Sequence, residues 1–129
     1  MVVGFGLDVV EIARIERLLG SSTADRFLSR VFTPGERGFC DRFQDRAERY
    51  AARFAAKEAA SKALGVPDGV GFQDVEVVRE RGAPTLLFRG AAAERAAALG
   101  ATRVHLTLSH DGGVAVAGVV LESAPERAP

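Results

Sequence analysis

The chain has 129 residues, of which 47% are hydrophobic and 26% charged, and its formal net charge at pH 7 is zero. These values are typical of one globular domain and exclude a globally basic nucleic-acid binder. The single cysteine, Cys40, excludes an internal disulfide and a cysteine-based zinc site. Glycines and acids interrupt the N-terminal stretch, and no run approaches the ~18 apolar residues of a membrane span. We therefore expect a cytoplasmic protein that neither enters a membrane nor binds nucleic acid.

The N-terminal part of the chain predicts one strand followed by three short helices. Residues 2–8 alternate glycines with larger apolar residues, which predicts a strand whose glycine side leaves room for another backbone or a ligand. Amphipathic patterns then predict helices over 11–19 and 24–32. Thr33-Pro34-Gly35-Glu36 is a capping box with proline at the first helical position, so a helix is expected over 34–43.

The remainder predicts a long helix and two hairpins. An alanine-rich helix is expected over 46–64, because Gly65 and Pro67 end the pattern. Strands are expected over 75–78 and 85–88 and over 103–109 and 114–121, with turns at 81–84 and 110–113 and a helix over 91–99 between the two hairpins.

This order predicts an α+β fold, an antiparallel sheet with helices packed on it. A small sheet with exposed edges often gains burial by forming oligomers. We place a single domain at 1–122 and expect a flexible C-terminal tail at 123–129, because its sequence is polar and contains prolines.

The segment 53–65 holds the most reactive side chains. On a 3.6-residue period, Glu58, Ser61 and Lys62 share one stripe of the predicted helix. Lys57 and Lys62 are the only lysines among 17 basic residues. Taken alone, the stripe predicts an exposed helix with an ion pair between Glu58 and Lys62, four residues apart.

Asp8, at the end of the first predicted strand, supplies a second carboxylate. Its alternatives are a helix N-cap, a turn acid or a metal ligand. Two carboxylates on separate elements suit Mg²⁺, which completes its shell with water and phosphate oxygens. Lys62 is placed to meet a phosphate as a point charge. No Walker A loop is present. The residues alone therefore predict magnesium-dependent phosphate-ester chemistry.

Three stretches together resemble a known family. GLDVVEIARI at 6–15, FAAKEAASKALG at 54–65 and LSHDGGVAVA at 108–117 resemble, in order, the three signatures of the 4′-phosphopantetheinyl transferases. The match is to the small bacterial type, the holo-(acyl-carrier-protein) synthases. The larger members are double-length pseudodimers, so the resemblance implies the transferase fold as a homotrimer with sites at subunit interfaces.

The resemblance implies transfer of 4′-phosphopantetheine from coenzyme A to a serine of apo acyl carrier protein, releasing adenosine 3′,5′-bisphosphate, in fatty acid biosynthesis. It implies Asp8, Glu58 and Lys62 as catalytic residues, with Mg²⁺ held by Asp8 and Glu58. The base that the resemblance implies is Glu58, acting directly or through a metal-bound water. The residues implied in binding the co-substrate coenzyme A are Lys62, Ser61, Arg53, Gly82, Pro84, Ser109 and His110.

Carrier proteins of this class are acidic, so Arg14, Arg17 and Arg26 are the expected docking face. Two alternatives are the same chemistry on polyketide or peptide synthase carriers and a non-catalytic trimer that binds coenzyme A. Lys57 points about 100° away from Glu58 on an ideal helix, so it serves either structure or another part of the cofactor. His105 is expected to be an outward-facing strand residue.

Overall fold

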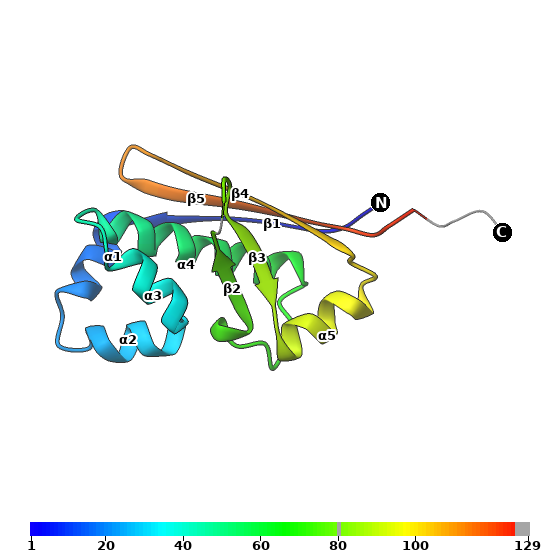
Figure 1. Cartoon of the computed structure of the whole chain (residues 1–129), viewed down its shortest axis with the longest axis horizontal. Helices are drawn as coiled ribbons and strands as arrows, with labels where there is room; N and C mark the ends of the chain where they lie inside the picture. Colours follow the sequence, from blue (N-terminus) through cyan, green and yellow to red (C-terminus); the bar gives the residue numbers. More distant parts are fainter. Residues whose placement is uncertain (80, 126–129) are drawn as a thin grey trace.

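The computed structural model describes residues 1–79 and 81–125, which form five strands, five α-helices and one 3₁₀ turn (Figure 1). In chain order the elements are β1 (Val2–Glu11), α1 (Ile12–Leu19), α2 (Ala24–Val31), α3 (Pro34–Cys40), α4 (Arg46–Ala63), η1 (Phe72–Asp74), β2 (Val75–Val78), β3 (Thr85–Phe88), α5 (Gly90–Ala98), β4 (Arg103–Asp111) and β5 (Val114–Glu122).

The predicted α+β class is confirmed, but the strands form two antiparallel sheets where one was expected. The larger sheet has the order β1-β5-β4, and β2 pairs only with β3. The β2–β3 hairpin has four residues per strand and buries Val75, Val77 and Leu86 in the core. Helix α4 runs along one face of the larger sheet, and the other helices and the hairpin lie on that same side (Figure 1).

The glycine side of β1 lies directly against α4, as the sequence predicted. A Cβ atom added to Gly6 would stand 1.9 Å from the carbonyl oxygen of Ala59, and one added to Gly4 would stand 2.2 Å from that of Ala63. Only glycine permits this approach of strand to helix. The buried alanines of α4 allow it from the other side.

The opposite face of β1 is apolar and open. Phe5, Leu7 and Val9 are 63%, 50% and 55% exposed. They stand opposite Val120, Gly118 and Val116 of β5, so the apolar surface continues across two strands. A contiguous apolar surface of this kind marks an interaction site more often than a solvated face.

Several element ends differ from the predicted ones. Strand β1 continues to Glu11 and β4 to Asp111, because both stay paired with β5 up to Val114. Asp8 therefore lies within its strand, not at the end. The turn consists of Gly112 and Gly113, whose φ angles of 59° and 83° suit a two-residue hairpin.

Four helices end earlier than predicted, α2, α4 and α5 by one residue and α3 by three. Helix α2 ends at Val31 because Phe32 is already extended, and α3 ends at Cys40 because the chain turns through Asp41 to reach α4. The capping box at the start of α3 is confirmed: Thr33 N–H donates to Glu36 Oε1 at 2.9 Å, and Glu36 N–H donates to Thr33 Oγ1 at 3.2 Å.

In the described part of the chain, no helix combines the length and the apolarity needed to cross a membrane. Ser123 N–H donates to the carbonyl of Met1 at 2.8 Å, which ties the N-terminus to the segment that follows β5. Of the predicted tail at 123–129, residues 126–129 lie outside the described residues, and its flexibility stays a prediction.

Candidate active site

Asp8 and Lys62 meet where β1 crosses α4. Lys62 Nζ lies 3.0 Å from Asp8 Oδ1 and donates a second hydrogen bond, of 2.9 Å, to the carbonyl of Leu7. The expected ion pair between Glu58 and Lys62 is replaced by this contact, because the strand brings a carboxylate to the lysine from 54 residues away. The Lys62 side chain is half-exposed, so its ammonium stays accessible to a ligand.

Glu58 shares this corner of the molecule. Partial burial and the nearby Asp8 carboxylate raise the pKa of Glu58 above its ordinary value of 4.5, while the Lys62 ammonium and the Arg14 guanidinium oppose the rise. Two carboxylates close enough to perturb one another, each on a rigid element, are typical of a site that binds a cation.

The donor set at this corner fits a hard divalent cation. No group of three or more histidine, cysteine, aspartate or glutamate side chains that could hold a metal occurs among residues 1–79 and 81–125. Mg²⁺ needs only one or two protein carboxylates when phosphate oxygens and waters complete its shell, and Asp8 and Glu58 supply two. Asp8 Oδ1 pairs with the Lys62 ammonium in this structure, so a cation bound here would share the Asp8 carboxylate with Lys62 or displace it.

A pocket of about 340 Å³ opens beside Glu58. Its walls come from Lys57, Glu58 and Ser61 of α4, from Arg30 of α2, and from the segment 70–75 that follows α4. It therefore combines an acid, a hydroxyl and a guanidinium with apolar side chains. Arg30 was not predicted as a site residue, since nothing in its own segment distinguishes it from the other exposed arginines.

Arg53, Pro84 and His110, all predicted to bind coenzyme A, line a second pocket of about 240 Å³. Arg53 is only 5% exposed, its Nε has no hydrogen-bond partner, and its guanidinium lies 4.2 Å from the centre of the Phe39 ring. Burial lowers the pKa of Arg53. Arg79, which the sequence did not single out, lines the same pocket. A guanidinium with an unmet donor favours an anionic ligand.

Ser109 and His110 lie on opposite faces of the larger sheet. They are consecutive residues of β4, so their side chains point to opposite faces of the sheet. His110 faces α4, with Nδ1 4.0 Å from Glu48, whereas Ser109 shares the open face with Val116. Gly82 lies outside this pocket, although its carbonyl accepts a 3.0 Å bond from Arg79 Nε. The roles of Ser109 and Gly82 stay predictions.

The two halves of the candidate site lie on different sides of α4. Arg53 and Glu58 are five residues apart, which separates them by about 140° around an α-helix. The pocket that contains Arg53 includes neither Asp8, Glu58 nor Lys62. The chain therefore presents two pockets that face in different directions.

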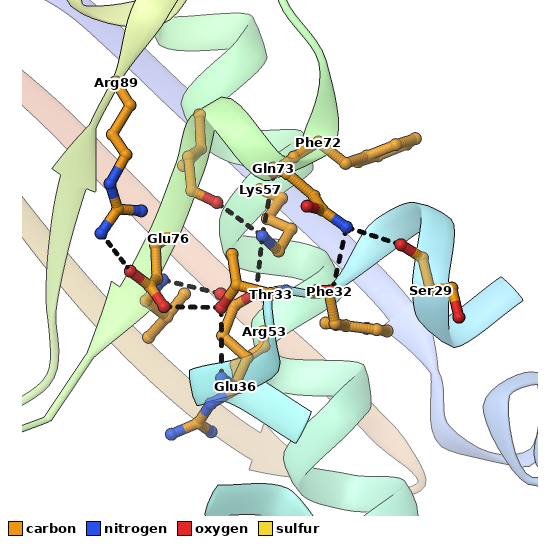
Figure 2. Close-up of polar contacts among 12 residues, drawn as sticks. Ser29, Phe32, Thr33, Glu36, Arg53, Lys57, Phe72, Gln73, Glu76 and Arg89 are labelled. Carbon is orange, nitrogen blue, oxygen red and sulfur yellow. Dashed lines mark hydrogen bonds and ion pairs between the residues drawn. The ribbon is translucent and has the colours of Figure 1, made fainter. Parts of the chain in front are cut away.

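Lys57, whose role the sequence left open, is a structural residue in the first instance. It is 2% exposed and forms a 2.8 Å ion pair with Glu36 (Figure 2). Burial lowers the pKa of Lys57, and the Glu36 carboxylate opposes that effect. The expected docking residues behave differently: Arg14, Arg17 and Arg26 are all exposed on α1 and α2. Arg14 also lies 5.8 Å from the centre of the Phe54 ring.

Comparison with known proteins places these features in a family context. The sequence pattern of the 4′-phosphopantetheinyl transferase superfamily matches residues 4–117. The chain is 62% identical over 126 residues to a holo-[acyl-carrier-protein] synthase of Anaeromyxobacter dehalogenans, covering 96% of this chain and 98% of that relative. It is similar to a holo-(acyl-carrier-protein) synthase from Bacillus anthracis in complex with CoA (3′,5′-ADP), with a TM-score of 0.77, 40% identity, and coverage of 96% of this chain and 99% of the other. It also resembles the Helicobacter pylori holo-[acyl-carrier-protein] synthase in complex with coenzyme A, with a TM-score of 0.78, 33% identity, and coverage of 92% and 99%.

Proposed function

The chain belongs to the 4′-phosphopantetheinyl transferase superfamily, and on that premise we propose that it is a holo-(acyl-carrier-protein) synthase. It transfers 4′-phosphopantetheine from coenzyme A to a serine of apo acyl carrier protein and serves fatty acid synthesis. The observation that carries this function is the meeting of Asp8, Glu58 and Lys62 where β1 crosses α4. Two acids and an amine at one corner suit a diphosphate ester.

The reaction forms one bond and breaks one bond at phosphorus. The serine oxygen of the carrier bonds to the β-phosphorus of coenzyme A, and the bond from that phosphorus to 3′,5′-ADP breaks. Glu58, or a water held beside it, accepts the serine proton. Its raised pKa makes the carboxylate a stronger base than an ordinary glutamate.

Lys62 contributes a positive charge beside the diphosphate. Its half-exposed ammonium can move from Asp8 to a phosphate oxygen as the ligand enters. Asp8 and Glu58 would hold Mg²⁺, which when bound neutralises charge on the diphosphate and on the departing 3′,5′-ADP. Ser61 lies about one helical turn after Glu58, lines the pocket beside it, and is placed to form a hydrogen bond to coenzyme A.

The pocket around Arg53 is proposed to bind the nucleotide end of coenzyme A. Its buried guanidinium suits the 3′-phosphate, and His110 and Pro84 complete the wall. Because this half-site faces away from Glu58, one coenzyme A would use the Glu58 side of one protomer and the Arg53 side of its neighbour. A homotrimer closed by the open face of β1 would meet that need.

The carrier protein is proposed to dock on α1 and α2. Arg14, Arg17 and Arg26 are exposed there, and an acidic partner would bring opposite charge to them. Arg14 also lies near enough to Glu58 to lower its pKa, so the docking surface adjoins the reactive corner. The carrier serine could therefore reach the diphosphate without a large movement of either protein.

The decisive experiment is a transfer assay. The protein is incubated with apo acyl carrier protein, coenzyme A and Mg²⁺, and the carrier is weighed by mass spectrometry. A phosphopantetheine mass gain that disappears with Glu58→Gln supports the proposal. A mass gain only on polyketide or peptide synthase carriers would mean that these, and not the fatty acid carrier, are the acceptor proteins. No mass gain on any carrier, with coenzyme A still bound, would favour a non-catalytic trimer that binds coenzyme A.

A further inference from the structure

The buried Lys57 uses every proton of its ammonium group. Besides the 2.8 Å pair with Glu36 Oε1, Nζ donates to the carbonyls of Phe72 and Val75, at 2.9 and 2.5 Å. These three acceptors come from two parts of the chain, α3 and the consecutive elements η1 and β2 (Figure 2). An ammonium with three rotatable donors suits such a junction, whereas the flat fork of arginine does not.

Glu36 completes the junction from the other side. It is 1% exposed, and its Oε1 accepts from Thr33 N–H as well as from Lys57, while Oε2 accepts from Val77 N–H at 2.7 Å. The carboxylate therefore joins the start of α3 to β2, and the ammonium joins both to α4. Apolar side chains of equal volume would often stabilise a fold as well as a buried ion pair does, so stability alone does not account for this pair. Its bonds instead join α3, η1, β2 and α4.

The segments that this pair fixes form the pocket beside Glu58. Phe72 and Val75, whose carbonyls accept from Lys57, line the wall that faces Glu58 and Ser61. The same wall is held from a second direction, because Gln73 Nε2 donates to the carbonyls of Ser29 and Phe32 at the end of α2, at 2.5 and 3.2 Å (Figure 2). Lys57 and Glu58 are consecutive residues of α4. The same turn of α4 therefore supplies Glu58 to one side of the pocket and, through Lys57, holds the wall of Phe72 and Val75 on the other.

We propose that Lys57, anchored by Glu36, is a positioning residue that sets the width of the pocket beside Glu58. Lys57 lies in the lining of this pocket, but its side chain is only 1% exposed and its ammonium is fully engaged, so it acts through the Phe72 and Val75 carbonyls. This inference rests on the proposed function, since it assigns the pocket to coenzyme A. Loosening the pair moves one wall, so binding of coenzyme A weakens while docking of the carrier on α1 and α2 is unaffected.

The test compares kinetic constants among variants at a temperature well below unfolding. Lys57→Met removes the three hydrogen bonds and keeps much of the volume, and Lys57→Arg keeps the charge but not the geometry. We expect both to raise the KM for coenzyme A by about tenfold, less than the ~100-fold that a 1 Å misplacement can cost, and to leave the KM for the carrier unchanged. Isothermal titration with coenzyme A should show a similar, about tenfold, rise in Kd.

A purely structural Lys57 gives another result. The variants would then melt at lower temperature, but the folded protein would keep both KM values and its Kd for coenzyme A, which overturns the inference. If Lys57→Met does not fold, Gln73→Ala tests the same wall from an exposed residue, with the same expected split between the two KM values. An unchanged KM for coenzyme A in Gln73→Ala would likewise reject the role of the wall.

The wild-type protein separates this inference from the proposed function. If the wild type modifies a carrier and the variants keep its KM for coenzyme A, only the positioning role fails. If the wild type modifies no carrier, the proposed function fails, and the titration with coenzyme A alone still decides the role of Lys57. A rise of about tenfold in the Kd of Lys57→Met for coenzyme A would then support it, and an unchanged Kd would reject it.

Discussion

Replacing Gly6 by alanine should separate β1 from α4 and disable the protein. The new Cβ would lie 1.9 Å from the carbonyl oxygen of Ala59, and ordinary contact begins at 3.4 Å. The strand must therefore move by about 1.5 Å, and because the obstacle is backbone, we place the cost near the upper end of the ~1–3 kcal/mol typical of overpacking. For a domain of this size that lowers the melting temperature by roughly 10 °C.

The same movement displaces Asp8, two residues along the strand, from Lys62 and Glu58. A shift of about 1 Å in a reacting group can cost ~100-fold in rate, so kcat/KM for the transfer should fall by that order. Calorimetry measures the stability and the mass-spectrometric assay measures the transfer. Gly38→Ala is the matched control for stability, because nothing lies within 4 Å of its Cβ position, and in a helix it should stabilise by about 0.5–1 kcal/mol. A Gly6→Ala protein that melts with the wild type would refute the close contact of strand and helix.

Three further predictions address the acid, the docking face and the open sheet. Because burial and Asp8 raise the pKa of Glu58 in the folded protein, folded Glu58 binds a proton more tightly than unfolded Glu58, and stability falls as pH rises from 4.5 through the raised value. At pH 7 the Glu58→Gln variant should therefore have a higher melting temperature than the wild type, and it should lose transfer activity. On acidification, wild-type activity should already fall at pH values above 4.5, because Glu58 becomes protonated there and can no longer act as the base. A lower melting temperature for the variant would contradict this. Arg17→Glu should raise the KM for the carrier about tenfold and leave the KM for coenzyme A unchanged. If the variant and the wild type have the same KM for the carrier, α1 is not part of the docking face. Phe5→Asp places a charge on the open face of β1 and should leave a monomer in light scattering, whereas a trimer would show that this face is not the interface.

Local chemistry made much of the fold predictable. Thr33 and Glu36 are three residues apart and cap the same helix, and the Gly112–Gly113 pair has few uses other than a tight turn. The course of α4 followed from its alanines and from Gly65, to within one residue of its end. Such signals depend on neighbours in sequence, so a single sequence is enough to read them.

The partners of the charged residues were not predictable in this way. Lys62 bonds to Asp8 across 54 residues, and Lys57 bonds to Val75 across 18. Spacing on one helix favours the partner four residues away, whereas the tertiary structure offered Lys62 a carboxylate on a neighbouring strand. The separation of Ser109 from His110 was within reach, since consecutive strand residues alternate, but the strand was expected to stop before His110.

In the proposed trimer, the two faces of α4 would make each protomer contribute to two active sites. Glu58 and Arg53 of one α4 helix would bind two different coenzyme A molecules, so no single protomer would contain a complete site. Two inactive proteins, one lacking Glu58 and one lacking Arg53, could then restore each other's activity when their subunits are exchanged, because about one quarter of randomly paired interfaces would combine the intact halves. Dilution that dissociates the trimer would therefore abolish activity, even where the separated subunits stay folded.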